Sequence, residues 1–291
     1  MGTADHLARV TPERVLLAVQ AAAPELGVSA LCERARGWSC AVFVSPEGYG
    51  VRVPLSAAKA EEAAWSAPLL RRIESRLPFA VPVPIAEVPW VHGAATVFRW
   101  IAGAARARLG LEGAAALGDA LRAVHALPVD SVTRGLERVP WSILVASWNE
   151  AIHVEVLPRV APRTAASWEA LLEAARSAAR SCEGHVLVHG DLELDEILWS
   201  GPRLVGLTDW DSWLVGDPAW DVRFLARDCD AAEQQAFATS YRAPPELLAR
   251  ARAYAAITPL EDALSAVRGD NDAHVREALQ HLEARPRAEL R

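Results

Sequence analysis

The hydrophobic pattern of the first third of the chain predicts a small β-rich region. Ala41-Val-Phe-Val and Tyr49-Gly-Val-Arg-Val flank the turn sequence Ser45-Pro-Glu-Gly, as in two strands joined by a hairpin. The prolines within residues 80–86 favour an extended chain, and Thr96-Val-Phe-Arg-Trp-Ile is typical of a buried strand. Two helices are predicted beside these strands: residues 12–22, with Thr11 as N-cap, and residues 57–75, interrupted or restarted near Pro68.

The rest of the chain is mainly helical, with one short β-rich stretch. Val186-Leu-Val precedes a predicted hairpin, in which Ile197-Leu-Trp and Leu204-Val-Gly-Leu flank the turn Ser200-Gly-Pro. Helical periodicity covers three segments: residues 111–127, 164–181 and about 218–285. The pattern therefore predicts an α+β protein with a small β-rich N-terminal lobe, residues 1–100, and a larger, mainly helical C-terminal lobe, residues 101–291.

Composition narrows the classes of function. The 291 residues are 52% hydrophobic and 23% charged, as in globular proteins, and the net charge of −7 argues against a nucleic-acid partner. Because no apolar segment is long enough to cross a membrane, we expect a soluble cytoplasmic protein, either a monomer or a homodimer. The four scattered cysteines favour buried free thiols. Lys59 is the only lysine, which we interpret as coding bias toward arginine.

Three carboxylates flank the second predicted hairpin. Asp191 lies on the loop that enters its first strand, Glu196 precedes that strand, and Asp209 follows the second strand. Because the two ends of a hairpin open at the same mouth, we expect these groups to converge, and a hard cation such as Mg²⁺ would compensate their repulsion. The spacing is also that of the protein-kinase catalytic loop, in which an Asp precedes an Asn by five positions and a second Asp follows a hairpin.

Three motifs occur in order around this hairpin. They are His189-Gly-Asp-Leu with Ile197-Leu-Trp, then Thr208-Asp-Trp-Asp, then Gly216-Asp-Pro-Ala-Trp-Asp. The set resembles the aminoglycoside phosphotransferase family, which has a bilobal, protein-kinase-like fold. The resemblance implies Mg²⁺-dependent transfer of the γ-phosphate of ATP or GTP to a hydroxyl of a small molecule. The acceptor would be an antibiotic of the aminoglycoside, macrolide or peptide/nucleoside type, or a related metabolite. Acidic C-terminal segments would suit a cationic acceptor, although solvated surface explains them equally well.

The resemblance also implies roles for individual residues. Asp191, on the catalytic loop 189–196, would be the catalytic base, and Asp209, in the metal segment 209–211, would be the main Mg²⁺ ligand, together with Glu196. The remaining implied roles are phosphate binding by Arg52, nucleotide binding by Phe98, Trp100 and Ile101 in a hinge segment, acceptor contacts by Asp211 and Glu193, and bracing of the loop by Asp217 and Asp221.

Two departures from the family pattern leave a second function open. Glu196 stands where the family has Asn, and it adds negative charge close to the phosphates. Ser66 stands where the family has a Glu that pairs with the basic strand residue, so either Glu62, one turn earlier, serves instead or Arg52 lacks its partner. The alternative function is a catalytically degenerate kinase-fold protein that binds a nucleotide or small ligand without phosphoryl transfer.

Overall fold

The computed structural model describes residues 10–37, 39–136, 139–269 and 272–284. The chain divides into two compact units: unit 1 comprises residues 1–107, 127–136 and 193–213, and unit 2 comprises residues 108–126, 137–192 and 214–291. Within the described residues, no helix combines the length and the apolar character that a membrane span requires.

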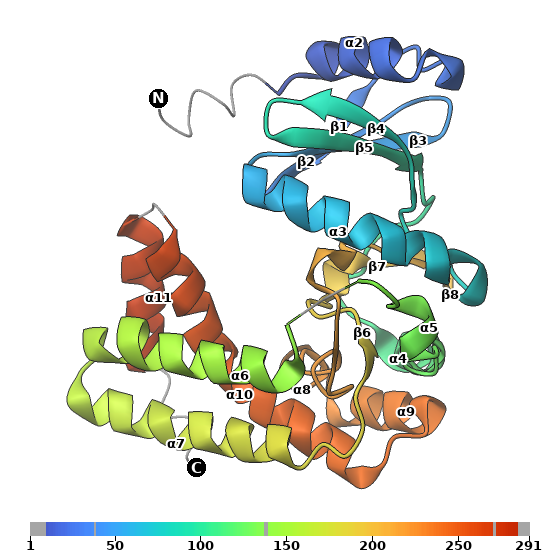
Figure 1. The fold of residues 1–291 in the computed structure, drawn as a ribbon. Coiled ribbons are helices and arrows are strands. Elements are labelled where there is room, and N and C mark those ends of the chain that lie inside the picture. Colours follow the sequence, from blue (N-terminus) through green and yellow to red (C-terminus); the bar gives the residue numbers. More distant parts are fainter. Residues whose placement is uncertain (1–9, 38, 137–138, 270–271, 285–291) are drawn as a thin grey trace. The chain divides into compact units, whose positions relative to one another are not determined.

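A five-stranded antiparallel sheet forms the centre of unit 1, with the strand order β1-β2-β3-β5-β4 (Figure 1). Its strands are β1 (Cys32–Arg36), β2 (Cys40–Val44), β3 (Tyr49–Pro54), β4 (Pro84–Trp90) and β5 (Gly93–Arg99). The predicted β2–β3 hairpin is confirmed, because Val44 pairs with Gly50 across the turn. The hydrophobic pattern did not predict β1, whose five residues are all exposed.

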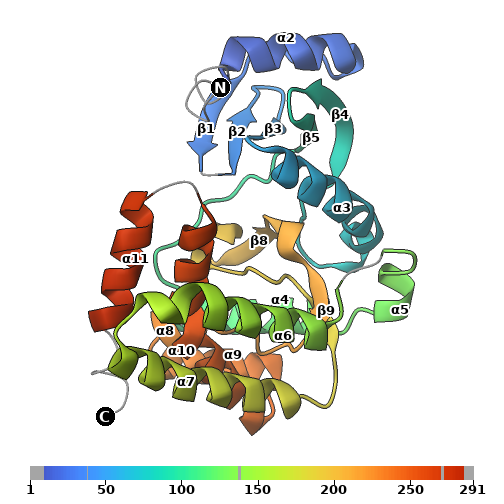
Figure 2. The same ribbon diagram turned by 60° about the vertical axis from the view of Figure 1, so that its left-hand side comes forward.

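Helix α2 (Pro12–Ala22) covers one face of this sheet (Figures 1 and 2). It begins as predicted after Thr11, whose side chain accepts a hydrogen bond from the backbone N–H of Arg14. Its buried positions Val15 and Val19 join the apolar cluster that also contains Phe43 and other inward-facing strand residues. Side chains that alternate with this cluster along the strands point to the opposite face of the sheet.

Helix α3 (Ala57–Ile73) lies on that opposite side (Figures 1 and 2). It runs through Pro68 without a break, so the predicted interruption is wrong. A proline inside a helix removes one backbone hydrogen bond and strains the preceding turn. Here the residues on both sides of Pro68 are packed, since Ala67, Leu69 and Leu70 are buried, and this packing offsets the loss.

The predicted second hairpin is confirmed as β7 (Ile197–Ser200) and β8 (Arg203–Leu207), and it belongs to unit 1. Two other segments of unit 1 hold it: the N–H of Leu207 donates to the carbonyl of Ala80, and the N–H of Ala104 donates to the carbonyl of Trp199. A Cβ atom at Gly206 would lie 2.7 Å from the Ile101 side chain and 3.1 Å from the Ala80 carbonyl oxygen. This close approach requires glycine.

Unit 2 is mainly helical, as predicted for the C-terminal part of the chain. Its helices are α4 (Gly110–His125), α6 (Trp141–Ala151), α7 (Pro162–Arg180), α8 (Leu225–Asp228), α9 (Ala231–Tyr241), α10 (Pro245–Arg268) and α11 (Asp272–Ala284). Helix α4 packs against α9, and α10 packs against both α7 and α11 (Figure 2). Strand β6 (Val186–Val188) pairs in antiparallel with the unpredicted strand β9 (Leu214–Gly216). Strand β6 ends directly before the first motif, and β9 ends at Gly216, the first residue of the third motif. The α+β class is confirmed.

Candidate active site

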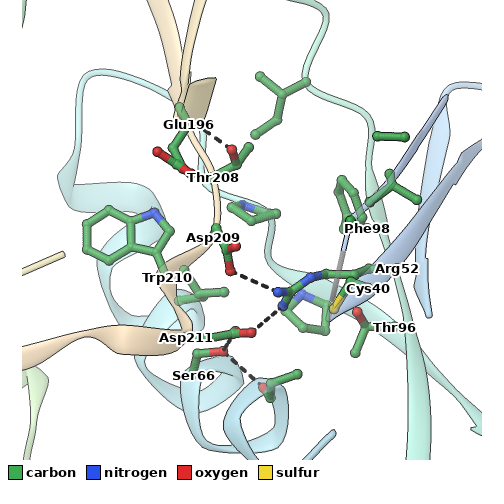
Figure 3. A pocket seen from close by; sticks show the side chains of 18 of the residues that line it. Cys40, Arg52, Ser66, Thr96, Phe98, Glu196, Thr208, Asp209, Trp210 and Asp211 are labelled. Carbon is green, nitrogen blue, oxygen red and sulfur yellow. Dashed lines mark hydrogen bonds and ion pairs between the residues drawn. The ribbon is translucent and has the colours of Figure 1, made fainter. Parts of the chain in front are cut away.

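A cavity of about 390 Å³ opens in unit 1 between the sheet, α3 and the β7–β8 hairpin (Figure 3). All the residues for which the sequence implies nucleotide or metal binding line it: Arg52, Phe98, Trp100, Ile101, Glu196 and Asp209. The cavity has an apolar part, formed by the residues that end and follow β5, and a charged part at the mouth of the hairpin. Its size and its mixture of apolar surface with a few polar groups are typical of small-molecule sites.

Arg52 links the sheet to the metal segment. It stands in β3 between Val51 and Val53, which are buried beneath α2, so its side chain points into the cavity. Its Nη2 lies 2.8 Å from Asp209 Oδ1, and its Nη1 lies 2.7 Å from Asp211 Oδ2. Burial alone would lower the pKa of Arg52, but the charges of Asp211 and Asp209 outweigh it and raise the pKa above the ordinary value.

Asp211 is a buried carboxylate with partners from β3 and α3. Only 3% of the residue is exposed. Besides Arg52, its partners are Lys59, whose Nζ lies 3.2 Å from Oδ2, and Ser66, whose hydroxyl donates to Oδ1 at 3.1 Å. Burial would raise the pKa of Asp211, but Arg52 and Lys59 together lower it, so the carboxylate is charged.

The partner of Arg52 is neither of the two alternatives drawn from the sequence. Glu62 pairs with Lys59 at 3.1 Å, and Arg52 pairs with Asp209 and Asp211. Ser66 does not replace a carboxylate but donates a hydrogen bond to one (Figure 3). The acid that pairs with Arg52 therefore stands on the metal segment instead of on helix α3.

Asp209 has an unusual backbone. Its φ of 56° and ψ of 56° are left-handed, a conformation that Asp tolerates better than most residues other than glycine. The next residue, Trp210, is buried, and its indole N–H donates to the carbonyl of Leu207. The Asp209 side chain is 44% exposed. Backbone strain at a half-exposed carboxylate in a cavity is common at functional sites.

Glu196 closes the loop that precedes β7. Its carboxylate accepts a hydrogen bond from the N–H of Glu193 at 2.7 Å, and the Glu193 side chain accepts one from the N–H of Glu196. This reciprocal capping ties the loop through a carboxylate at a position where the sequence resemblance led us to expect an amide. The carbonyl of Glu196 also accepts from the N–H of Thr208, which joins the loop to the start of the metal segment.

The carboxylates of this cavity suit Mg²⁺ in their chemistry. Asp209 and Glu196 supply the hard oxygen donors that this ion prefers. The described residues contain no cluster of three or more potential ligands of the His, Cys, Asp and Glu types. Mg²⁺ is usually held by one or two carboxylates, together with waters and substrate phosphates, so the donor set fits a metal that arrives with a nucleotide.

The loop that carries Asp191 lies in unit 2, where its backbone is fixed from two sides. Asp221, which is fully buried, accepts hydrogen bonds from the N–H groups of His189 and Gly190 at 2.8 and 2.9 Å. The indole N–H of Trp220 donates to the carbonyl of Gly190. Gly190 has a φ of 92°, which favours glycine. The Asp191 side chain is 65% exposed at the end of this fixed segment.

Two buried acids brace this region as the resemblance implies. Asp221 also pairs with His125 at 3.1 Å. Burial would raise the pKa of Asp221, but the hydrogen bond from His125 lowers it. Asp217 pairs with Arg250 at 2.7 Å and accepts a hydrogen bond from the hydroxyl of Tyr254. These contacts join the third motif to the catalytic loop, to α4 and to α10.

Arg223 and Glu261 are neighbours of Asp191 that the motifs did not reveal. The Arg223 guanidinium lies 4.0 Å from the centroid of the Trp220 ring, and its Nη2 lies 3.5 Å from Asp191 Oδ1. Glu261 has a buried Oε1 atom without a hydrogen-bond partner. Burial raises the pKa of Glu261 to about 7, while Arg223 acts in the opposite direction.

The expectation of buried thiols holds for only half of the cysteines. All four are free thiols, but only Cys40 and Cys229 are buried, whereas Cys32 is exposed and Cys182 is half-buried. Cys32 is exposed because it begins β1, whose five residues all face solvent. Burial raises the pKa of the Cys40 thiol, and Cys40 lines the cavity beside Arg52.

A comparison with protein families identifies the family of this chain. The sequence profile of the phosphotransferase enzyme family, APH, matches residues 31–285. The chain belongs to this phosphotransferase family. The match covers both units and all three motifs, so the resemblance drawn from the motifs is confirmed. Comparison with curated protein sequences gives no match.

Solved structures of phosphotransferases have the same fold. The GDP complex of a wild-type aminoglycoside 2'-phosphotransferase is 16% identical, with a TM-score of 0.84 over 96% of this chain and 100% of that one. A macrolide 2'-phosphotransferase from Brachybacterium faecium is 20% identical, with a TM-score of 0.75 over 94% and 98%. A streptomycin–ATP complex of an aminoglycoside phosphotransferase is 16% identical, with a TM-score of 0.69 over 94% and 96%. The protein-kinase-like fold is confirmed.

Proposed function

We propose that this phosphotransferase moves the γ-phosphate of ATP or GTP, in the presence of Mg²⁺, onto a hydroxyl of a small molecule. The observation that carries the proposal is the cavity of unit 1, which gathers every residue implied in nucleotide or metal binding. The exposed carboxylate of Asp191, on its fixed loop in unit 2, adds a candidate base. The similar structures were solved with GDP and with ATP, which supports a nucleotide donor and leaves its purine open.

The cavity would hold the nucleotide by its base and its phosphates. Phe98, Trp100 and Ile101 offer apolar surface for a purine, and Arg52 offers a guanidinium for the phosphate chain. Asp209 and Glu196 would hold Mg²⁺. When bound, the ion would neutralise charge on the phosphates during transfer.

Asp191 would act as the catalytic base. Its carboxylate would orient the acceptor hydroxyl and accept its proton. The hydrogen bonds of Asp221 and Trp220 to the preceding residues fix the backbone from which Asp191 projects. Since phosphoryl transfer depends mostly on positioning, this rigidity serves the reaction directly.

We assign the acceptor to unit 2 and the nucleotide to unit 1. The carboxylates of Asp191 and of Asp262 on α10 would suit an amine-bearing acceptor, and burial together with the charge of Asp191 raises the pKa of Asp262. One similar structure is a streptomycin complex and another is a macrolide phosphotransferase, so both antibiotic classes are candidates. The contacts of Asp211 and Glu193 favour roles as partner of Arg52 and cap of the loop, in place of the acceptor contacts expected from the sequence.

A transfer assay with radiolabelled ATP and GTP tests this function. The panel would contain kanamycin, gentamicin, streptomycin and a macrolide, each with and without Mg²⁺. We expect Asp191→Asn to lower kcat by about 100-fold or more while nucleotide affinity is kept. Asp119→Asn is the matched control, because this aspartate of the same unit has a side chain that is 61% exposed, against 65% for Asp191.

The same assay separates the enzyme from a degenerate binding protein. Nucleotide binding without transfer to any acceptor, and without Mg²⁺-dependent hydrolysis, would favour the degenerate kinase fold. Glu196 is the residue that motivates this second function, since its carboxylate is engaged in capping the loop. Transfer that appears only in Glu196→Asn would also favour it. A wild-type protein that binds neither ATP nor GTP would rule out the phosphotransferase function and would leave only a degenerate fold that binds another small ligand.

A further inference from the structure

Lys59 does not behave as one more solvated cation. It is the only lysine of the sequence, in which Lys and Arg together number 30. All the other residues of this group are arginine. A single lysine exposed to solvent would need no structural explanation. The Lys59 side chain, however, is only 15% exposed, and it lies on α3 beside the ion pairs of the unit 1 cavity. An ammonium at this place therefore requires an explanation.

Lys59 and Arg52 share one carboxylate oxygen. Arg52 Nη1 lies 2.7 Å from Asp211 Oδ2, and Lys59 Nζ lies 3.2 Å from the same atom. Ser66 donates to the other oxygen of Asp211, which fixes the orientation of the carboxylate (Figure 3). The compact ammonium can approach Oδ2 next to the guanidinium, whereas a second planar guanidinium would compete for the same space.

The charges of this group do not cancel. Arg52 and Lys59 carry two positive charges against the single negative charge of Asp211, whose side chain is 2% exposed. Asp209 and Glu62 also pair with these two cations, at 2.8 and 3.1 Å, but their side chains are 44% and 47% exposed, so solvent screens their charges more strongly. Arg52 and Asp211 line the cavity, and Lys59 contacts Asp211. The trio taken by itself therefore carries a net charge of +1.

We propose that Lys59, Asp211 and Arg52 form one phosphate-binding group, in which Lys59 offsets the charge of Asp211 so that the guanidinium of Arg52 stays available to the phosphates of the nucleotide. The proposal rests on the proposed nucleotide site. Lys59 is a positioning residue in this arrangement, and Arg52 is the residue that touches the phosphates. Without Lys59, the pair of Arg52 and Asp211 would be neutral and would attract an anion only weakly.

The test compares ligands that differ only in their phosphates. We expect Lys59→Met to weaken binding of ADP about tenfold or more, and to leave binding of adenosine unchanged. GDP and guanosine are measured in parallel. Lys59→Arg keeps the charge, but its guanidinium competes with that of Arg52 for the space beside Asp211, so its ADP affinity should fall less than that of Lys59→Met. Arg71→Met is the matched control, because Arg71 stands on the same helix and pairs with an exposed carboxylate, that of Glu87.

A chemical route removes the charge without a mutation. In acetylation, the unprotonated amine attacks the acyl carbon of acetic anhydride, an amide forms, acetate leaves, and the amine's proton goes to the buffer. Because Lys59 is the only lysine, its amine is the only side-chain amine that the treatment can modify, and mass spectrometry verifies acetylation at Lys59. The same treatment of Lys59→Arg modifies the α-amino group and any reactive thiols and phenols but no side-chain amine, and so gives the control. The acetylated wild type should lose ADP affinity as Lys59→Met does.

The outcomes distinguish this proposal from the function on which it rests. Unchanged ADP affinity in both Lys59→Met and the acetylated wild type would overturn the role of Lys59 while leaving the nucleotide site in place. Equal losses for ADP and adenosine would also overturn it, because they would mean a purely structural role. If the wild type bound neither ADP nor GDP, the proposed function itself would fall.

Discussion

Replacing Glu261 by glutamine tests how strongly unit 2 disfavours a charge beside the candidate base. Glu261 lies on α10, and its Oε1 atom is buried without a hydrogen-bond partner. Burial raises the pKa of Glu261 from 4.5 to about 7. The charged groups that act on it are Arg223, which lowers the pKa, and Asp262 and Asp191, which raise it.

The size and sign of the effect follow from this pKa. One pKa unit corresponds to about 1.4 kcal/mol, so the rise is worth at most about 3 kcal/mol. Below 4.5, Glu261 is protonated in both the folded and the unfolded chain. Between 4.5 and about 7 only the unfolded chain loses the proton, so the wild type becomes less stable as the pH rises through this window. Above this window the wild type has lost the whole of this stability contribution, and a further rise in pH changes nothing more.

Glutamine cannot ionise, so Glu261→Gln escapes this loss. Relative to the wild type, the variant should gain up to about 3 kcal/mol of unfolding free energy between about pH 4 and about pH 8. A domain of this size shifts its melting temperature by about 2–4 °C per kcal/mol, so the relative gain is up to about 6–12 °C. Tryptophan fluorescence follows the unfolding.

The control for this prediction is Glu246→Gln, because Glu246 is an exposed glutamate on the same helix. Its melting temperature should differ from that of the wild type by the same amount at both pH values. If the difference between Glu261→Gln and the wild type were equally independent of pH, Glu261 would not hold its proton in the folded protein and the reasoning would be refuted.

Three further substitutions probe the packing of both sites. Asp217→Asn should lower the free energy of unfolding by about 3–5 kcal/mol, because it removes the fully buried counter-charge of Arg250, whose side chain is only 12% exposed. Adding Arg250→Met should recover part of the loss in a urea denaturation cycle. Asp221→Asn should cost about 1–3 kcal/mol in thermal melts, since an amide oxygen cannot replace both carboxylate oxygens as acceptors for two buried N–H groups; no change would contradict this. In Gly50→Ala the new Cβ would overlap the Phe98 ring, so we expect weaker ATP or GTP binding in calorimetry together with a stability loss of about 1–3 kcal/mol. Wild-type affinity would show that the ring is not part of the site.

The elements with strong periodicity were predictable from the sequence. The β2–β3 and β7–β8 hairpins each combine apolar runs with a turn sequence, and both are confirmed. Strand β1 escaped prediction because its residues are exposed and mostly polar, so it shows no alternation. The break expected at Pro68 was wrong. Proline disfavours the interior of a helix, but the packing of the buried residues around Pro68 outweighs the one backbone hydrogen bond that is lost.

At the candidate site, the motifs revealed the carboxylates but not the side chains that pair with them. Asp191, Glu196 and Asp209 were found from their spacing. The pairing of Arg52 with Asp211 joins residues far apart in the sequence, and no periodicity encodes such a contact. Lys59 did carry a signal, its uniqueness among the basic residues, but composition alone could not separate a coding bias from a requirement for an ammonium.

The position of Asp211 has a consequence for regulation. Protein kinases carry the acid that pairs with the phosphate-binding cation on a mobile helix, and displacement of that helix switches them off. Here the acid lies two residues from Asp209 on the same short segment, and α3 contributes only Lys59 and Ser66. A shift of α3 would weaken the ion pair of Arg52 without breaking it. The ion pairs of Arg52 with Asp209 and Asp211 therefore do not depend on an acid carried by α3.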